Sequence, residues 1–503
     1  MDYVSLPAKL VYYAKRHLGL EDLDAVYAKN LIMAALNLFE PEDVPLSDTE
    51  LEEIDGYEVP DVLVWEVMQC AKRQSLCPEG MEESFAAGIM GLLSPAPSAL
   101  AANFDRFKEV SPQKACDYLY DISIKNNYIQ KTAISKNLYW KKDFGDNSIE
   151  ITINLSKPEK DNREIARMLA QPQASYPKCM LCVENMGFAG TLAKPPRQNL
   201  RIVPVTLDGA QWYLQYSPYL YYDRHCIVFS KEHTPMKVDA STPRKLCDFV
   251  REFPHFFVGS NASIPIVGGS ILSHEHFQGG GGKLPLHHAG DLMQYQSGRF
   301  EDVCFSIVNW YNSVIRLRSE NAGQLTAAAA ALIEHWRGYN CEELGIISHT
   351  GQTGHNAVTP IMRLEDGVYI LDMILRNNRT DTNHPDGIFH AHKQYHHIKK
   401  EGIGLIEAMG LFILPGRLKR ETEEIAAILT GASQGAGLEI HRDMISTLKQ
   451  QAGGIVSPLK ANNLIRDYIS ETCRSILINT AVFKPDNSRA RDTFKKFVED
   501  FIK

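Results

Sequence analysis

The chain lacks several features that would place it in a specialised class of protein. No apolar run approaches the length of about 20 residues that a membrane span requires. Residues 1–5 show no basic start followed by an apolar stretch, so no secretory signal is expected. The ten cysteines are few for 503 residues and scattered, apart from one close pair, which favours reduced thiols in the cytoplasm over a disulfide framework. A net charge of −8 disfavours a nucleic-acid backbone as the main partner.

The composition indicates an ordinary globular protein of several domains. The chain is too long for one compact core, and its residues are 44% hydrophobic and 23% charged. Hydrophobic residues recur at helical spacing before about residue 130 and after about residue 420, whereas residues 149–155 alternate as a half-buried strand does. Between these ends we expect helices over 162–170, 243–253, 301–318, 322–337 and 403–414, and strands over 149–155, 225–230, 264–267, 270–277 and 368–375.

The most informative motif is His-Glu-His-Phe-Gln, which follows a glycine-rich loop. On an extended chain, His274, His276 and Gln278 project to one face, and glycine lets backbone N–H groups approach an anion closely. A neutral imidazole beside such a loop can attack phosphorus. Gln278 cannot titrate but can donate to a phosphoryl oxygen, which favours transfer over hydrolysis. The alternative is a polar edge strand or a surface loop.

A second motif, Cys-x-x-Cys, is formed by Cys179 and Cys182. A turn at this spacing can point two thiolates at one metal ion, and two histidines are a usual complement. His233, after an expected strand, and His274, just before His276, are the candidates, with His225 as a competing ligand. The alternatives are a redox pair or two unrelated thiols, and for His225 a buried core histidine.

Taken together, these segments resemble one known family. Residues 259–280, Gly-Ser-Asn-Ala-Ser-Ile-Pro-Ile-Val-Gly-Gly-Ser-Ile-Leu-Ser-His-Glu-His-Phe-Gln-Gly-Gly, and residues 176–185 resemble the second, bacterial class of the galactose-1-phosphate uridylyltransferase family, within the histidine-triad superfamily. The resemblance implies an α+β fold with two histidine-triad-like halves, each an antiparallel sheet with helices. It divides the chain into a helical N-terminal region (1–135), a catalytic half (136–298), a second half (299–420) and a helical C-terminal region (421–503).

The resemblance also implies roles for individual residues. His276 corresponds to the nucleophile that accepts UMP, and Gln278 to the glutamine that binds the phosphoryl oxygens. The zinc ligands it implies are Cys179, Cys182, His233 and His274. The loop residues it implies for nucleotide phosphates are Asn261, Gly268, Gly269 and Ser270. Glu275 departs from the better-known class, which has proline there, and we expect its side chain to face solvent.

The second half carries weaker correspondences. His390 and His392 resemble an element that holds a second metal, with His355 as a possible third ligand; alternatively, these histidines line a hexose pocket or bind phosphate. Lys400 and Glu407 resemble the hexose-binding segment, where a lysine pairs with phosphate and a glutamate accepts hydrogen bonds from sugar hydroxyls. Residues 377–379 could also face the ligand.

The expected function is therefore hexose-1-phosphate uridylyltransfer, with UDP-glucose and galactose 1-phosphate as substrates, in a cytoplasmic homodimer without nucleic-acid or membrane partners. One alternative is an adenine-nucleotide phosphorylase or adenylyltransferase of the same superfamily. Another is a non-catalytic nucleotide-binding zinc protein. A hydrolase is disfavoured because residue 278 is not histidine.

Overall fold

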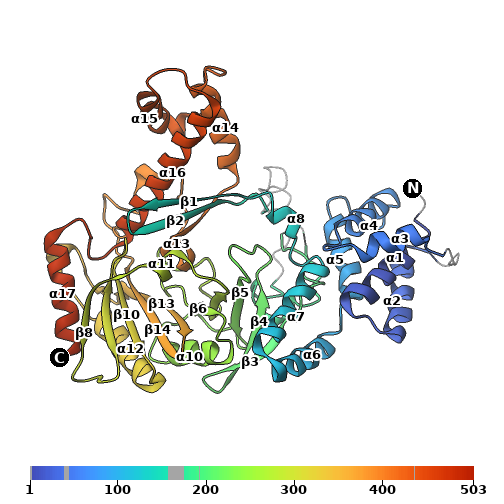
Figure 1. The fold of residues 1–503 in the computed structure, drawn as a ribbon, viewed down its shortest axis with the longest axis horizontal. Coiled ribbons are helices and arrows are strands. Elements are labelled where there is room, and N and C mark those ends of the chain that lie inside the picture. The colour runs from blue at the N-terminus through green and yellow to red at the C-terminus, as the bar shows by residue number, and fades with distance from the viewer. Residues whose placement is uncertain (1–2, 39–44, 157–174, 192, 436) are drawn as a thin grey trace.

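A ten-stranded antiparallel sheet forms the centre of the molecule. The computed structural model describes residues 3–38, 45–156, 175–191, 193–435 and 437–503. Figure 1 shows this sheet in the lower part of the molecule, with helices beneath it. The order across the sheet is β3-β4-β5-β7-β6-β13-β14-β10-β9-β8. Its strands are β3 (Val203–Leu207), β4 (Ala210–Tyr216), β5 (Cys226–Ser230), β6 (Phe257–Gly259), β7 (His276–Gly280), β8 (Asp291–Gln296), β9 (Cys304–Val308), β10 (Val314–Ser319), β13 (Asn356–Glu365) and β14 (Val368–Asn377).

The two sides of this sheet repeat one topology. Three consecutive strands, β3-β4-β5, are followed in the chain by helix α10 (Thr242–Glu252) and then by β6 and β7. The strands β8-β9-β10 are followed in the same way by α12 (Ala322–Arg337) and then by β13 and β14. In each five-stranded array the last strand of the chain order lies beside the third: β7 lies beside β5, and β14 beside β10. The two arrays meet where β6 pairs with β13.

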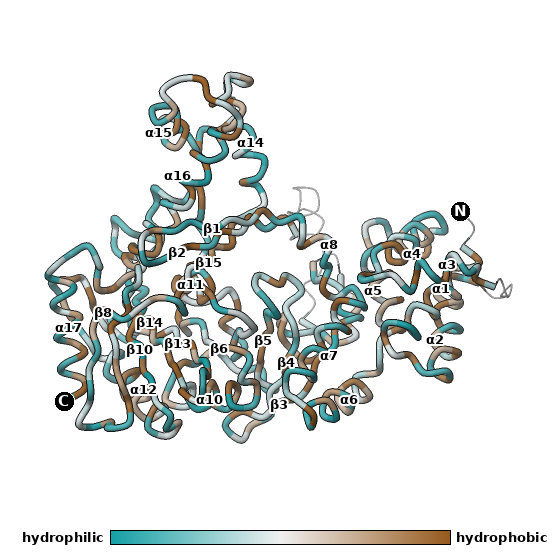
Figure 2. The backbone as a smooth tube through the Cα atoms, viewed as in Figure 1, coloured by the Kyte–Doolittle hydropathy of each residue, from teal (hydrophilic) through white to brown (hydrophobic). Residues whose placement is uncertain are grey.

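The two faces of the sheet are covered differently. Side chains that alternate along each strand separate into two hydrophobic clusters, as the two-residue period of a strand requires. Val258, Phe277 and Leu371 join the larger cluster, which includes the buried residues of α10 and α12. Phe257 and Ile374 join the second cluster, which lies on the opposite face with residues of segment 403–418. Figure 2 shows hydrophobic residues recurring along β13 and β14. These two strands pair with each other in the interior of the sheet, between β6 and β10.

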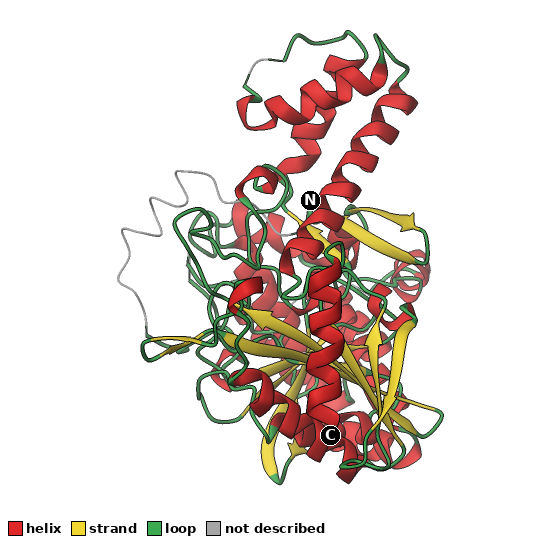
Figure 3. Cartoon of the chain, turned by 90° about the vertical axis from the view of Figure 1, so that its left-hand side faces the viewer, coloured by secondary structure: helices red, strands yellow, loops and turns green. Residues whose placement is uncertain are grey.

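Helices extend the chain at both ends. Figure 1 places the first helices to one side of the sheet and α14–α16 in an arm above it, and Figure 3 shows this arm projecting from the body. The N-terminal helices are α1 (Leu6–Tyr13), the π-helical turn η1 (Ala14–Leu18), α2 (Asp22–Ala35), α3 (Asp48–Asp55), α4 (Asp61–Arg73), α5 (Glu82–Leu93), α6 (Pro97–Val110), α7 (Pro112–Lys125) and α8 (Lys131–Ile134). The C-terminal helices are α14 (Arg417–Leu429), η5 (Glu439–His441), α15 (Arg442–Ala452), α16 (Pro458–Thr480) and α17 (Ser488–Ile502).

Smaller elements connect these parts. A separate sheet has the order β1-β2-β15, in which β2 and β15 are parallel. It comprises β1 (Leu138–Phe144), β2 (Asn147–Ile153) and β15 (Leu411–Leu414), and a hairpin is formed by β11 (His349–Thr350) and β12 (Thr353–Gly354). The remaining short helices are η2 (Val183–Asn185), α11 (Pro285–His288), η3 (Glu342–Leu344), η4 (Lys393–Tyr395) and α13 (Leu405–Ala408). No single helix among the described residues is long and apolar enough to cross a membrane; the bent pair α5 and α6, at 58° to each other, passes that test only when joined.

The α+β class predicted from the sequence is confirmed, and so are several of its elements. The expected strands over 149–155, 225–230 and 368–375 and the helices over 243–253 and 322–337 correspond to β2, β5, β14, α10 and α12. The helix expected over 162–170 lies outside the described residues.

Four expectations were wrong. Residues 301–318 form β9 and most of β10 in place of a helix, and residues 403–414 form the short helix α13 followed by β15. Residues 264–267 are a loop, and the strand expected over 270–277 begins only at His276. Apolar spacing was compatible with both periods, and pairing with distant strands decided the outcome for residues 301–318 and 411–414, whereas residues 264–267 belong to no strand.

Candidate active site and metal centre

Two cysteines and two histidines converge beside the start of β7. Cys179 and Cys182 come from the loop before η2, His233 from the segment after β5, and His274 from the residues just before β7. The Sγ atoms of the cysteines are 3.5 Å apart; Cys179 Sγ lies 3.3 Å from His274 Nδ1, and Cys182 Sγ lies 3.0 Å from His233 Nδ1. All four donor atoms lie within 4.8 Å of one another. This spacing suits a four-coordinate ion, so these side chains could hold a metal.

Surrounding groups orient this cluster. His274 Nε2 donates to the carbonyl of Ser230 at 2.8 Å, which leaves Nδ1 as the lone-pair nitrogen directed at the cysteines. The side chain of Asn185 donates to the carbonyls of Cys179 and Cys182, at 2.8 Å each. Burial acts to raise the pKa of the Cys179 thiol, but hydrogen bonds, foremost that with His274, outweigh it and lower that pKa. A lowered thiol pKa favours the thiolate, which is the metal-binding form.

His276 is the first residue of β7 and is almost fully buried. Its Nδ1 lies 2.8 Å from the carbonyl oxygen of His274, which can only accept a hydrogen bond, so Nδ1 carries the proton. Burial lowers the pKa of His276 to about 4, which keeps the ring neutral. The imidazole is therefore fixed in the tautomer whose lone pair is on Nε2, the form needed for nucleophilic attack.

Gln278 projects to the same face of β7 and is held by His225. His225 Nε2 lies 3.1 Å from Gln278 Oε1, and burial lowers the pKa of His225 to about 4. A neutral His225 that donates from Nε2 fixes the amide of Gln278 with its NH₂ group directed away from His225. The metal cluster does not include His225, so its competing role as a ligand is not observed. Sequence reasoning missed this contact because the pairing of β5 with β7 creates it.

Glu275 is buried, which corrects the expectation that it faces solvent. Its carboxylate accepts a hydrogen bond from Lys245 Nζ on α10 at 2.6 Å, and Lys245 lies 5.3 Å from the ring centroid of Trp212. Trp212 in turn stacks on Phe277 with centroids 4.9 Å apart. Alternation along the chain sends Glu275 to the face opposite His274 and His276, where α10 supplies its partner.

The glycine-rich loop closes over Asn261. A Cβ atom at Gly268 would lie 2.4 Å from the carbonyl of Ala262, so only glycine fits there. One at Gly269 would lie 2.7 Å from the side-chain nitrogen of Asn261, which would have to shift. Ile266 in this loop has φ of 73°, a strained conformation for a β-branched residue. Ser270 is exposed beside it. The loop is thus held in one unusual conformation close to the start of β7.

The second half contributes a buried ion pair to this face. Lys399 Nζ lies 2.9 Å from Glu407 Oε1, and the Lys399 side chain also donates to the carbonyl of Ile413. Lys400, the residue expected from the sequence, is exposed. Tyr221 connects the two halves here, because its ring stacks 5.6 Å from that of His225 and Glu407 contributes, after burial, to raising its pKa.

The segment before Glu407 is tied to both halves. The Leu405 N–H donates to Asn261 Oδ1 at 2.8 Å, and a Cβ atom at Gly404 would lie 2.9 Å from the same oxygen. His390 Nε2 accepts the N–H of Ile403 at 3.2 Å. Residues 402–405 therefore bring the glycine-rich loop and the second half into direct contact.

The histidines expected to hold a second metal do not form a group that could bind one among the described residues. His392 Nε2 bonds the carbonyl of Ile388 at 3.1 Å, while His355 bonds Asn378 and Thr350 at 2.9 and 2.8 Å. Within the described ranges, the one group of His, Cys, Asp or Glu side chains that could hold a metal is the cluster around Cys179. The side chains of all three expected ligand-facing residues, 377–379, also donate to backbone carbonyls.

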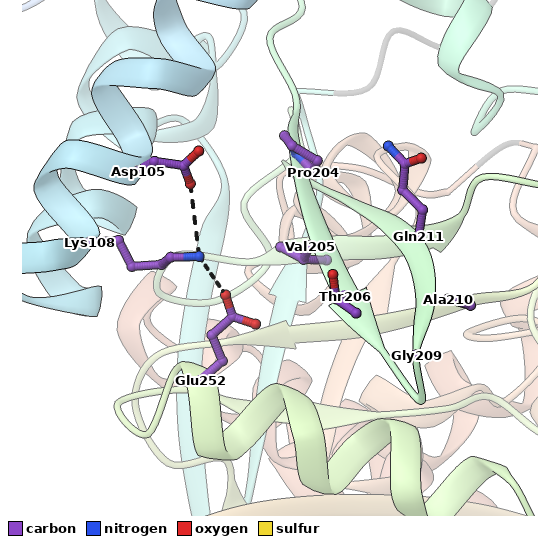
Figure 4. A pocket seen from close by; sticks show the side chains of 9 residues that line it. All are labelled: Asp105, Lys108, Pro204, Val205, Thr206, Gly209, Ala210, Gln211 and Glu252. Carbon is purple, nitrogen blue, oxygen red and sulfur yellow. Dashed lines mark hydrogen bonds and ion pairs between the residues drawn. The ribbon is translucent and has the colours of Figure 1, made fainter.

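A cavity of about 490 Å³ lies elsewhere, between α6, α10 and the β3–β4 hairpin. Figure 4 shows Lys108 at its wall, paired with Asp105 at 3.8 Å and Glu252 at 2.9 Å. None of its lining residues belongs to the site around His276.

Comparison with known proteins gives the family. A sequence model described as "Galactose-1-phosphate uridyl transferase, N-terminal domain" matches residues 65–235, and its C-terminal counterpart matches residues 249–444. Relatives named galactose-1-phosphate uridylyltransferase include that of Clostridium acetobutylicum, 45% identical over 97% of this chain and 98% of the relative. That of Bacillus subtilis is 40% identical over 95% of this chain and 93% of the relative.

Among solved structures, that of yeast Ap4A phosphorylase Apa2 aligns with a TM-score of 0.31 and 9% identity, over 64% of this chain and 90% of that one; we draw nothing from this similarity. The two family models and the full-length relatives place the chain among the nucleotidyltransferases. It belongs to the galactose-1-phosphate uridylyltransferase family.

Proposed function

We propose that this protein exchanges UMP between UDP-glucose and galactose 1-phosphate through a uridylyl group carried by His276. The observation that carries the proposal is the state of this imidazole: neutral, protonated on Nδ1 toward a backbone carbonyl, and with its lone pair on Nε2. Family membership agrees with this chemistry, because the relatives carry the name of that activity.

The reaction consists of two displacements at one phosphorus. The Nε2 lone pair of His276 attacks the α-phosphorus of UDP-glucose, and the bond from phosphorus to the bridging oxygen breaks, so that glucose 1-phosphate leaves with the electron pair. A phosphate oxygen of galactose 1-phosphate then attacks the same phosphorus, the N–P bond breaks, and UDP-galactose forms. The carbonyl of His274 stabilises the positive charge that develops on the ring, and no proton leaves Nδ1.

Gln278 and the loops hold the phosphates in this scheme. The Gln278 amide, oriented by His225, donates to a phosphoryl oxygen and cannot deprotonate water, which favours transfer over hydrolysis. We assign Glu407 to the hexose hydroxyls and transfer the role expected of Lys400 to its buried neighbour Lys399. The residues assigned to the nucleotide phosphates are Asn261, Gly268, Gly269 and Ser270.

We further propose that the Cys/His cluster holds zinc. Two cysteines and two histidines at tetrahedral spacing suit this ion, and a closed four-residue site has no position left for substrate. When bound, zinc would fix the segment that carries His276. We do not extend a second metal to His390 and His392, since among the described residues the one group of side chains placed to hold a metal is the cluster around Cys179. The homodimer and the cytoplasmic location stay predictions.

The repeated topology leads us to place the boundary between the two halves in the segment between β7 and β8. This is a few residues before the boundary at 298 expected from the sequence, because β8 pairs with β9 of the second array. The first half then contains the nucleophile and the Cys/His cluster, and the second half contains Lys399 and Glu407.

The test is to trap the intermediate. The protein is incubated with UDP-glucose labelled in the uracil, quenched, digested, and the UMP-bearing residue is located by mass spectrometry. We expect label on His276 and none in a His276→Asn variant, while His255→Asn, a histidine that packs on Phe256, retains it. Label from an adenine dinucleotide instead of UDP-glucose would favour the phosphorylase alternative, and no covalent label at all would refute the proposal.

A further inference from the structure

Arg376 lies on the same face of the central sheet as His276. Along β14, Leu371, Met373 and Leu375 belong to the cluster under α12, whereas Ile374 belongs to the opposite one. Arg376, two residues after Ile374, therefore projects with it onto the face that carries His276 and Gln278. Its neighbour on β13 is Thr359, which pairs with Ile374 and thus lies diagonally beside Arg376, about 7 Å away between Cβ atoms.

The guanidinium of Arg376 is fully buried and only partly bonded. Its Nη2 donates to the carbonyl of Ile403 at 2.8 Å, but Nε and Nη1 have no hydrogen-bond partner in the described part of the chain. Burial lowers the pKa of Arg376 to about 10, which still leaves it charged at neutral pH. The nearby anion Glu407 is bonded to Lys399, so these three buried charges sum to one unpaired positive charge.

Two further unpartnered groups lie near Arg376: His390, whose pKa the charge of Arg376 helps to lower after burial, and Thr359, its diagonal neighbour on β13. His390 accepts the Ile403 N–H on Nε2, so its Nδ1 carries a proton, and this Nδ1–H is buried with no partner among the described residues. The hydroxyl of Thr359 is likewise buried and unpartnered. All these free groups can donate hydrogen bonds, and a buried donor without an acceptor is costly. A buried positive charge with free hydrogen-bond donors near it is suited to bind an anion.

We propose that Arg376, with Thr359 and His390, binds the phosphate group of the hexose 1-phosphate. This inference rests on the proposed function and adds, beside Lys399, a second set of donors for the acceptor's phosphomonoester. Three terminal oxygens of a phosphate accept hydrogen bonds from several directions, and a charged donor contributes more than a neutral one.

The position of these donors suits the second displacement. Residues 402–405 separate them from the glycine-rich loop, and a Cβ atom at Gly402 would lie 3.3 Å from the carbonyl of Ile266. Asn261 reaches across to bond Leu405. Residues 402–405 therefore contact both Arg376, through Ile403, and the loop proposed to hold the nucleotide, on the face of the sheet that presents His276.

The test compares Arg376→Met with Arg201→Met. Arg201 is also buried, but it donates to the backbone carbonyls of five residues, Gly91, Ser94, Pro95, Gln198 and Leu200. Binding of inorganic phosphate and of galactose 1-phosphate is measured by calorimetry, and the acceptor KM is measured on enzyme already carrying UMP. We expect Arg376→Met to weaken both by about 10- to 100-fold and to slow UMP labelling of His276, because glucose 1-phosphate, which leaves UDP-glucose in that step, presents the same phosphate. The ligand-free unfolding temperature should not be lowered. Arg201→Met should lower that temperature and leave acceptor affinity within twofold.

The outcomes separate the inference from the proposed function. An acceptor KM within twofold of wild type in Arg376→Met, or a loss of stability as large as in Arg201→Met, overturns the inference. If Arg376→Met does not fold, Thr359→Val, which removes one donor at constant shape, must weaken phosphate binding at least threefold for the inference to stand. Phosphate binding through Arg376 without any UMP label on His276 would refute the proposed function alone.

Discussion

The buried ion pair between Lys245 and Glu275 gives the sharpest prediction about stability. Its side chains are 14% and 9% exposed, the charged atoms are 2.6 Å apart, and Lys245 also faces the ring of Trp212. Removal of one partner of a buried pair leaves the other charge uncompensated and costs about 3 kcal/mol or more. We therefore expect Glu275→Gln and Lys245→Met each to lower the free energy of unfolding by about 3 kcal/mol.

A double-mutant cycle isolates the interaction. The variant that carries both changes buries no unpaired charge. Its loss of unfolding free energy should therefore be about 2–3 kcal/mol smaller than the sum of the losses in the two single variants. Unfolding in urea is followed by circular dichroism. Because a chain of several domains need not unfold in one step, hydrogen exchange of the β7 amides measures the stability of the strand beside the ion pair.

The same variants test whether this ion pair positions the nucleophile. The backbone of Glu275 bonds Ser230 and Thr234, and its neighbours are His274 and His276. Glu275→Gln should therefore slow UMP labelling of His276, and the double variant should recover part of the rate. A coupling free energy below about 0.5 kcal/mol, the value typical of exposed pairs, would refute the reasoning.

Three further predictions concern the site. Cys182→Ser, which removes one ligand, should lose the bound metal by elemental analysis and lower the unfolding temperature by at least ~5 °C; an unchanged metal content would contradict the assignment. Gln278→His places a titratable group beside the uridylyl group and should release UMP from UDP-glucose without an acceptor, measured by chromatography; labelled enzyme that releases no more UMP than wild type would count against the role of the amide. His225 and His390 have folded-state pKa values of about 4 through burial, so the unfolded chain binds more protons below about pH 6.5. The free energy of unfolding should fall as the pH is lowered from 6.5 to 4, by up to roughly 3 kcal/mol for each group. The total fall should be smaller in His225→Phe, which lacks one of these groups.

Local pattern was enough to predict the parts of the site that lie within one segment. The two-residue period placed His276 and Gln278 on one face, and both side chains do bond within the face opposite Phe277. The same period also places Glu275 on the other face, but its partner Lys245 lies 30 residues earlier on α10, so sequence alone did not indicate an ion pair.

Features that depend on tertiary pairing were not predictable. Residues 301–318 have apolar spacing that suits a helix, yet β9 pairs with β8 and β10, and β10 pairs with β14, and this pairing decides their structure. Arg376 looks like an ordinary strand-end arginine in sequence. Its burial arises only because segment 402–405 folds over the sheet, where Ile403 contacts it.

The pairing of β6 with β13 has a consequence for turnover. Hydrogen bonds join Val258 and Gly259 to Met362 and Ile361, and the Ser260 N–H to the Pro360 carbonyl, so one uninterrupted sheet spans the molecule. The nucleophile's half and the acceptor's half therefore cannot swing apart as rigid bodies without breaking this seam. The proposed exchange of the outgoing sugar phosphate for the incoming one must therefore take place without separation of the two arrays.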